Sequence, residues 1–406
     1  MIFKRLIVDK IIPYLNTDDI IVLHGARQVG KTHILYYLQN YLKTKGVVTH
    51  YIDLEDSRYV TILDGGTDNF IHYLEEEGLP IHQPERGKSK LFVFIDEIQY
   101  LKTPSPFLKL MADHHPSVKL IVSGSSSFEI KNKFTESLVG RTVDFEVFNL
   151  SFLEFLIFRD YAWKKQKTYT GKKINELKKL FEEFTLYGGY PKIALTGSLA
   201  MKEKYLQQII DTYIRKDIRD LAHIKETDKF NKLLEVLASQ SGNLLNVTEL
   251  SNTCNLAKQT IENYLFILEQ TYIIKRLRPW SGNLRSELFK IPKIYFYDSG
   301  LMQMLWLKGL QKKILGNVLE TTIFNELVKH YSKDAIFYWR TLDKKEIDFI
   351  VRIKNKIFPL EVKLNFQSFR PTAIRYLEER AQTTGYKVIG LEGRKENSHF
   401  IYPWEL

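Results

Sequence analysis

The chain has 406 residues, more than one ordinary hydrophobic core holds, so we expect two or three domains. Hydrophobic residues make up 44% and charged residues 26%, which excludes an intrinsically disordered chain. No apolar run reaches the roughly 18 residues of a membrane helix, and the first residues lack the features of a secretory signal. The single cysteine, Cys254, excludes a disulfide framework. We therefore expect a cytoplasmic protein with no membrane partner.

The net charge is +11, with 59 basic and 48 acidic residues. This surplus favours a polyanionic partner such as nucleic acid, although a generically basic surface explains it equally well. The aromatic residues, 13% of the chain, are spread along the sequence. They indicate core positions rather than a surface on which bases stack.

Short apolar runs separated by helical patterns fill the first part of the chain. Four runs are predicted strands: residues 20–23, 47–54, 91–95 and 118–122. The run at 91–95 is apolar throughout, as in a strand that is buried on both faces. Strands that alternate with helices predict a parallel sheet, so we expect an α/β domain over residues 1–149.

A phosphate-binding motif lies directly after the first predicted strand. The pattern G-x-x-x-x-G-K-S/T is matched in full by Gly25, Ala26, Arg27, Gln28, Val29, Gly30, Lys31 and Thr32. Glycines let the backbone wrap a phosphate closely, and the N–H groups at the start of the following helix face the anion. We expect Lys31 to reach the β- and γ-phosphates of ATP, and Thr32 to hold Mg²⁺. His33 completes the nucleotide-binding stretch, although packing on the helix is its simpler role.

An acidic pair ends the strand at residues 91–95. Asp96 is expected at the carboxyl edge of the sheet, where it binds Mg²⁺ directly or through water. Glu97 is the predicted general base that polarises the attacking water. An acidic turn after a core strand is the simpler alternative, and it is weak beside an intact phosphate loop.

Two further candidates follow the strand at 118–122. Ser123 or Ser125 could orient the water or contact the γ-phosphate, and a polar turn is an equally good interpretation. Arg141 could act as an arginine finger, in its own chain or on a neighbour. A surface salt bridge explains Arg141 equally well, so both alternatives stay open.

The phosphate loop, the IDEIQ stretch at 95–99 and the SGSSS stretch at 123–127 resemble the AAA+ superfamily. The specific resemblance is to bacterial and archaeal "ATP-binding protein" ATPases with a C-terminal domain of unknown function. Further matching stretches are Gly188-Gly189-Tyr190-Pro191, the YFYDSGL stretch at 295–301, and Glu361-Val362-Lys363. The resemblance implies a Mg²⁺-dependent ATPase and spans nearly the whole chain, but it does not identify a biochemical task.

Residues 150–228 have helical spacing and predict a helical lid or connector, and residues 229–280 predict a winged-helix module. In the module, a short helix from Thr248 and a second helix at 257–270 flank a turn near Asn255, and residues 272–279 are the predicted β-wing. Its candidate DNA-contacting residues are Lys258, Gln259, Thr260, Asn263, Lys275, Arg276 and Arg278. Many such modules only pack against their own protein, so packing remains the alternative.

Strands return in residues 281–406, where we predict an α/β domain. A long helix is predicted at 316–331, and the strands are predicted at 294–297, 335–339, 347–351, 357–362 and 387–391. Glu320 on the helix, Asp348 in one strand, and Glu361 with Lys363 in the next resemble the PD-(D/E)XK nuclease core. Such a core would hold a second Mg²⁺, or Mn²⁺, on Asp348 and Glu361. The alternative is a salt-bridged pair on a folded but inactive domain.

Two functions fit these patterns. The first is an ATP-driven machine that acts on DNA through the winged-helix module and the nuclease-like domain. The second is a nucleotide-dependent switch that recruits a protein partner, with an inert C-terminal domain. Either could form a homo-oligomer.

Overall fold

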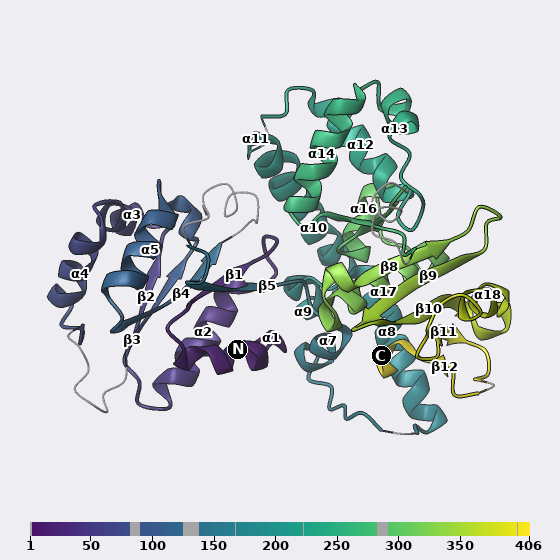
Figure 1. Cartoon of the computed structure of the whole chain (residues 1–406), viewed down its shortest axis with the longest axis horizontal. Helices are drawn as coiled ribbons and strands as arrows, with labels where there is room; N and C mark the ends of the chain where they lie inside the picture. The colour runs from purple at the N-terminus through teal and green to yellow at the C-terminus, as the bar shows by residue number, and fades with distance from the viewer. Residues whose placement is uncertain are drawn as a thin grey trace. The chain divides into compact units, whose positions relative to one another are not determined.

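The computed structural model describes residues 2–81, 90–124, 138–166, 168–221, 223–281, 291–395 and 397–406 (Figure 1). The chain divides into two compact units, Met1–Phe148 and Asn149–Leu406. Among the described residues, no helix combines the length and the apolar character needed to span a bilayer.

A five-stranded parallel sheet forms the centre of the first unit (Figure 1). Its strands are β1 (Ile20–His24), β2 (Thr49–Asp53), β3 (Leu91–Asp96), β4 (Val118–Gly124) and β5 (Thr142–Glu146). The order across the sheet is β2-β3-β4-β1-β5, so β4 lies between β1 and β3. The four predicted strands are found. Strand β5 was not predicted, although Val143 and Phe145 alternate with polar residues there.

Helices cover both faces of this sheet. They are α1 (Ile7–Ile11), α2 (Lys31–Lys43), α3 (Ser57–Asp64), α4 (Thr67–Glu76) and α5 (Pro104–His114), with the short 3₁₀ turns η1 (Ile12–Asn16) and η2 (Ile98–Tyr100). Ile20 and Val22 of β1 share a core with residues of α3, α4 and α5. Ile21 and Leu23 point to the opposite face and are fully buried as well. There α2 packs against β2, β3 and β4.

A buried lysine fixes the amino edge of the sheet. Lys119 of β4 donates a hydrogen bond from its amine to the carbonyl oxygen of Thr17 at 2.8 Å and another to that of Asp19. Its side chain is 2% exposed, and burial lowers its pKa to about 8. The ammonium group thus ties the turn before β1 to β4.

The second unit begins with helices. They are α7 (Phe152–Phe158), α8 (Gly171–Tyr187), α9 (Pro191–Leu195), α10 (Leu199–Ile209), the π-helical η4 (Ile210–Ile218), α11 (Arg219–Leu221), α12 (Thr227–Ser239), α13 (Val247–Cys254) and α14 (Lys258–Gln270). Strand β6 (Ile274–Leu277) follows and pairs antiparallel with β7 (Lys293–Phe296). The predicted wing within residues 272–279 is therefore wrong in its extent. The partner strand β7 lies within residues 281–406, which were assigned to the C-terminal domain. The prediction failed because a long connection separates the two paired strands in the sequence.

A second sheet forms the C-terminal part of this unit. It contains β8 (Ile336–Arg340), β9 (Glu346–Ile353), β10 (Lys356–Asn365), β11 (Lys387–Glu392) and β12 (Phe400–Ile401), in that order. Strands β8, β9 and β10 are antiparallel to one another, and β11 runs parallel to β10. The accompanying helices and turns are α16 (Ser299–Leu307), α17 (Gly316–His330), η5 (Lys333–Ala335), η6 (Phe366–Ser368), α18 (Thr372–Glu378) and η7 (Pro403–Glu405).

Two of the stretches that carry the family resemblance, residues 188–191 and 295–301, contact each other inside the second unit. The buried Asp298 carboxylate accepts hydrogen bonds from the backbone N–H of Gly189 at 2.8 Å and from the amide of Asn149 at 2.6 Å. It also caps α16 through the N–H of Leu301. A Cβ on Gly188 would lie 2.1 Å from Asp298 Oδ1. These stretches therefore have a structural role, and burial raises the pKa of Asp298.

We expect Gly188→Ala to lower the free energy of unfolding of the second unit by about 3 kcal/mol, because the methyl group meets Asp298 and the backbone has a φ of +82°. Chemical denaturation of the full chain, followed by near-UV circular dichroism, measures this. Gly197→Ala is the control, since a Cβ there meets nothing within 4 Å. Equal stabilities for both variants would contradict the packing.

Lys119 predicts a pH dependence of stability in the first unit. The unfolded chain keeps this proton up to its ordinary pKa of 10.5, while the folded state releases it near 8. The folded state thus binds fewer protons in this window, so stability rises with pH, by up to about 1.4 kcal/mol per pH unit. Urea midpoints across the window measure the slope. Lys119→Met is expected to lose it, and an unchanged slope would argue against a titrating Lys119.

Candidate functional site

The phosphate loop connects β1 to α2, as its sequence predicts. Gly25 and Gly30 have φ values of 156° and 95°. A Cβ on Gly25 would lie 2.1 Å from the carbonyl oxygen of Val147, so only glycine fits this approach to the segment after β5. Arg5 holds the loop from outside, since it donates hydrogen bonds to the carbonyl oxygens of Val29 at 2.7 Å and Phe148 at 2.8 Å. Arg5 was not among the predicted site residues, because no local sequence pattern marks it.

The side chain of Lys31 bends back towards the phosphate loop. Its Nζ donates hydrogen bonds to the carbonyl oxygens of Gly25 at 3.0 Å and Ala26 at 2.8 Å. Burial lowers its pKa to about 8, and the nearby carboxylates of Glu97 and Asp96 partly offset this effect. The loop therefore contains a cation whose present partners are neutral carbonyls, for which a phosphate can compete.

Asp96 lies at the carboxyl edge of the sheet, at the end of β3. Its Oδ2 accepts a hydrogen bond from the hydroxyl of Tyr51 at 2.9 Å, and its Oδ1 accepts one from the hydroxyl of Ser123. Because β4 lies between β1 and β3, Ser123 lies between the strand of the phosphate loop and Asp96. Tyr51 was not among the predicted site residues. Its pKa is raised by burial and by the Asp96 carboxylate.

Glu97 follows Asp96 in the left-handed region, with a φ of 57°. Its N–H donates to Asp96 Oδ1 at 3.2 Å, and its carboxylate accepts a hydrogen bond from the amide of Gln99. A non-glycine residue in this conformation costs free energy, and such positions gather at functional sites. Lys31, Asp96, Glu97 and Ser123 are thus brought together at one edge of the sheet.

The other predicted residues of the first unit lie elsewhere. Ser125 falls outside the described residues. Arg141 precedes β5 at the amino edge of the sheet, where it forms an ion pair with Asp113 at 2.6 Å. Because the phosphate loop lies at the opposite edge, Arg141 does not reach it within its own chain, and an action on a neighbour stays a prediction. His33 is exposed, with its ring 6.4 Å from that of Tyr36.

The residues at this edge suit a magnesium ion bound with a nucleotide. Mg²⁺ commonly takes one or two carboxylates together with substrate phosphates and water. The Thr32 hydroxyl and the Asp96 carboxylate are oxygen donors of this kind. Within the described ranges, no group of three or more His, Cys, Asp or Glu side chains is placed to hold a metal ion. The expected second metal of the C-terminal domain therefore has no support.

The C-terminal carboxylates are paired with lysines. Lys363 Nζ donates hydrogen bonds to Glu361 Oε2 at 2.5 Å and to Asp348 Oδ2 at 3.3 Å. The buried Lys293 lies 3.4 Å from Glu320 Oε1 and 2.7 Å from Glu346 Oε1. The predicted residues Glu320, Asp348, Glu361 and Lys363 do gather in one region. Lys293 was missed, since a lysine at the start of a strand ordinarily indicates an exposed end.

Burial and mutual repulsion shift the titration of this cluster. Burial, followed by the negative charge of Asp348, raises the pKa of Glu320 to about 7 and that of Glu361 to about 8. The hydroxyl of Tyr295 donates to Glu320 at 2.5 Å. The cluster thus combines carboxyl groups that resist ionisation with lysines that compensate part of their charge.

Comparisons with known proteins match three family models along the chain. Residues 17–156 match the family model of an AAA domain. Residues 178–313 and 315–402 match two domains of unknown function, DUF8612 and DUF4143. The family match and the phosphate loop on a parallel sheet together support the AAA+ superfamily for the first unit, and this fold indicates nucleotide binding. The resemblance of the last domain to a nuclease receives no such support.

Individual relatives extend over most of the chain. An uncharacterised protein of Haemophilus influenzae is 27% identical over 89% of this chain and 86% of its own length. The uncharacterised protein MJ1544 of Methanocaldococcus jannaschii is 27% identical over 87% of this chain and 76% of its own length. Among solved structures, the ADP form of the ORC2 protein of Aeropyrum pernix covers 66% of this chain and 85% of its own, at 12% identity and a TM-score of 0.33.

Proposed function

We propose that this protein binds ATP with Mg²⁺ and hydrolyses it in the first unit. The observation that carries the proposal is the meeting of Lys31, Asp96 and Glu97 at the carboxyl edge of one parallel sheet. Lys31 exchanges its two carbonyl partners for the β- and γ-phosphates of ATP. Thr32 and Asp96 hold Mg²⁺, which neutralises charge on the phosphates when it is bound.

The other residues at this edge position the reacting groups. Glu97 accepts the proton of the attacking water as general base. Ser123 and Tyr51 donate hydrogen bonds to the two oxygens of Asp96, which orients that carboxylate. Arg5 donates to the carbonyl oxygen of Val29 and so supports the shape of the loop.

We expect Glu97→Gln to retain ATP binding and to slow hydrolysis by about 10²-fold or more, because the amide accepts no proton. Equilibrium ATP binding and phosphate release measure the two effects separately. A normal hydrolysis rate in this variant would remove Glu97 as the base.

Two lysine variants on α2 complete the test. Lys31→Ala loses both binding and hydrolysis, since it removes the cation of the loop. Lys43→Ala removes an exposed lysine from the same helix and keeps both. Wild-type turnover in Lys31→Ala would contradict the proposed site.

We further propose that the second unit contacts DNA, with ATP hydrolysis in the first unit driving this activity. The helices α12, α13 and α14 followed by β6 and β7 support a winged-helix module, and Leu244 forms a bridge to Lys293 at the edge of that pair. The order α17-β8-β9-β10-α18-β11 supports a nuclease-like fold. Lys363 of that predicted core lies beside Glu361 and Asp348, and the activity proposed for this unit is DNA contact rather than cleavage.

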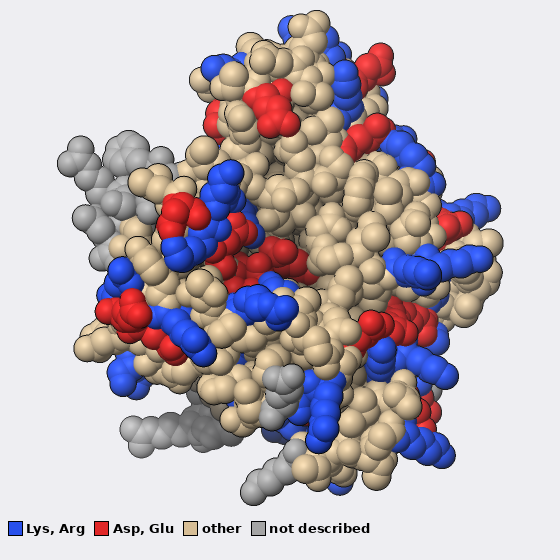
Figure 2. Space-filling view, turned by 90° about the vertical axis from the view of Figure 1, so that its right-hand side faces the viewer, with Lys and Arg blue, Asp and Glu red and all other residues tan. Residues whose placement is uncertain are grey.

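A basic pocket beside β6 is the specific observation that favours DNA. Its volume is about 210 Å³, and its charged lining comprises Lys275, Arg276, Arg278, Lys333, Asp334 and Arg352. Lys275 and Arg276 are paired with Glu269, so the exposed Arg278 and Arg352 are the better phosphate contacts. On the face shown in Figure 2, blue and red side chains lie side by side and do not form a continuous basic surface.

We expect Arg278→Ala and Arg352→Ala each to weaken duplex DNA binding and to reduce the slope of log affinity against log salt by about 1, because each removes one phosphate contact. Fluorescence anisotropy across a salt series measures this. Lys179→Ala removes an exposed charge of the same unit away from the pocket and leaves the slope unchanged.

An alternative function is a nucleotide-dependent switch that recruits a protein partner or another copy of the chain. It predicts an ATPase rate that DNA does not change, together with ATP-dependent association in sedimentation. If duplex DNA leaves the ATPase rate unchanged and the two arginine variants bind DNA like wild type, the DNA proposal fails and the switch takes its place.

A further inference from the structure

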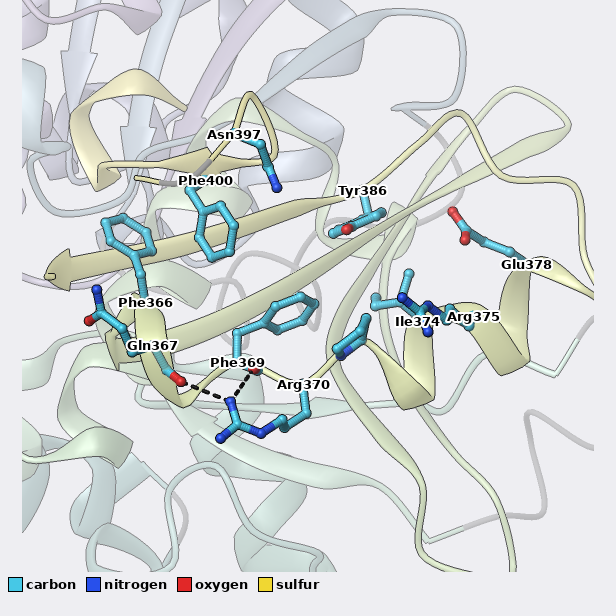
Figure 3. A pocket seen from close by; sticks show the side chains of 11 residues that line it. Phe366, Gln367, Phe369, Arg370, Ile374, Arg375, Glu378, Tyr386, Asn397 and Phe400 are labelled. Carbon is cyan, nitrogen blue, oxygen red and sulfur yellow. Dashed lines mark hydrogen bonds between the residues drawn. The ribbon is translucent and has the colours of Figure 1, made fainter. Parts of the chain in front are cut away.

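A cavity of about 470 Å³ opens in the C-terminal part of the second unit (Figure 3). It lies between η6, α18 and the segments around Tyr386 and Phe400. Its volume is within the range of small-molecule sites, which is roughly 300–1,000 Å³. Neither the phosphate loop nor the carboxylate cluster contributes to it.

Four aromatic side chains line the cavity. Phe366 and Phe400 are buried and meet edge to face, with ring centroids 5.2 Å apart. Phe369 and Tyr386 are half-buried, 6.0 Å apart, and both line the cavity. The ring of His399 stacks on Tyr386 at 4.1 Å and 2°, so one face of Tyr386 is already covered. Phe369 and Tyr386 therefore offer an aromatic surface on which a planar ring can stack.

Two arginines stand at the rim of this surface. Arg370 Nη1 donates hydrogen bonds to the carbonyl oxygens of Gln367 at 2.9 Å and Phe369 at 2.8 Å, drawn as dashed lines in Figure 3. These bonds orient its guanidinium group and leave Nε and Nη2 without a hydrogen bond to any described residue. The Arg375 side chain forms no hydrogen bond or ion pair within the described part of the chain. Both arginines are exposed and have donors available for an anion.

The remaining polar groups that line the cavity can form hydrogen bonds with the edge of a planar heterocyclic ring. Asn397 and Gln367 each carry an amide with both donors and acceptors, and Glu378 carries an acceptor carboxylate at the rim beside Arg375 (Figure 3). A phosphate alone would leave the aromatic wall unused, and an apolar ligand would leave two guanidinium groups without a partner. A nucleotide uses both, since it joins a planar base to a phosphate.

We propose that this cavity binds a nucleotide, with its base against Tyr386 and Phe369 and its phosphate on Arg375. The nucleotide is either free or part of a single strand, and both sources present the same chemistry. The second source deepens the proposed DNA function and rests on it. Stacking on an aromatic side chain is worth roughly tenfold in affinity or more per base.

The test uses the full chain carrying Lys31→Ala, so that the phosphate loop takes no nucleotide. The probes are AMP and a fluorescent single-stranded oligo-dT, each titrated by calorimetry or anisotropy. In this background Tyr386→Ala is expected to weaken binding by about tenfold, and Tyr386→Phe, which keeps the ring, to bind like the parent. Arg375→Ala is expected to reduce the salt slope by about 1, while Arg394→Ala, an exposed arginine outside the cavity, leaves it unchanged.

The outcomes separate the sources and the proposals. Binding of AMP that is lost in Tyr386→Ala supports a free nucleotide, and binding of oligo-dT alone with the same loss supports a strand. No binding of either probe overturns the site. Oligonucleotide binding that survives Tyr386→Ala and Arg375→Ala but is lost in Arg278→Ala overturns this site and leaves the proposed DNA function standing.

Discussion

The candidate ATP site depends on one constraint, the end of five parallel strands at a single edge of a sheet. Parallel strands bring their carboxyl ends together, so side chains that follow different strands meet there without any local signal. With β4 between β1 and β3, Ser123 at the end of β4 lies next to the strand of the phosphate loop, and its hydroxyl donates to Asp96. The same edge gives Lys31 its two neighbouring carboxylates. A different strand order would separate these groups while leaving every motif intact.

Buried charge organises the second unit in a comparable way. Asp298 is satisfied by Gly189, Asn149 and Leu301, and Lys329 donates to the carbonyl oxygen of Leu150 at 2.7 Å. An unpaired charge in these positions would be costly, so each one specifies a particular packing of distant segments. The simplest role of the stretches that carry the family resemblance in this unit is therefore to stabilise the packing of distant segments. Their presence indicates a fold more than a reaction.

The carboxylate cluster and the aromatic cavity illustrate how a fold and an activity separate. The carboxylates of the cluster lie on α17, β9 and β10, and Lys293 and Lys363 occupy positions next to them. An arrangement of this kind keeps its shape without a metal ion. The cavity near Tyr386, by contrast, combines ring surface with two exposed guanidinium groups, and the Arg375 side chain has no hydrogen bond or ion pair to any residue that the structure describes. The chemistry available for a ligand is thus richer in the cavity than in the cluster.

The sequence by itself determined the phosphate loop, Asp96, Glu97 and most of the strands, because these features are encoded locally. A loop needs its glycines and lysine in consecutive positions, and a buried strand needs a continuous apolar run. Only the tertiary structure decided that Arg141 lies at the far edge with Asp113, that β6 pairs with β7, and that Lys293 enters the carboxylate cluster. It also decided that Phe366, Phe369, Tyr386 and Phe400, dispersed in the sequence, form one wall. Contacts of this kind depend on strand order and chain reversal over tens of residues, and no local pattern of residues carries that information.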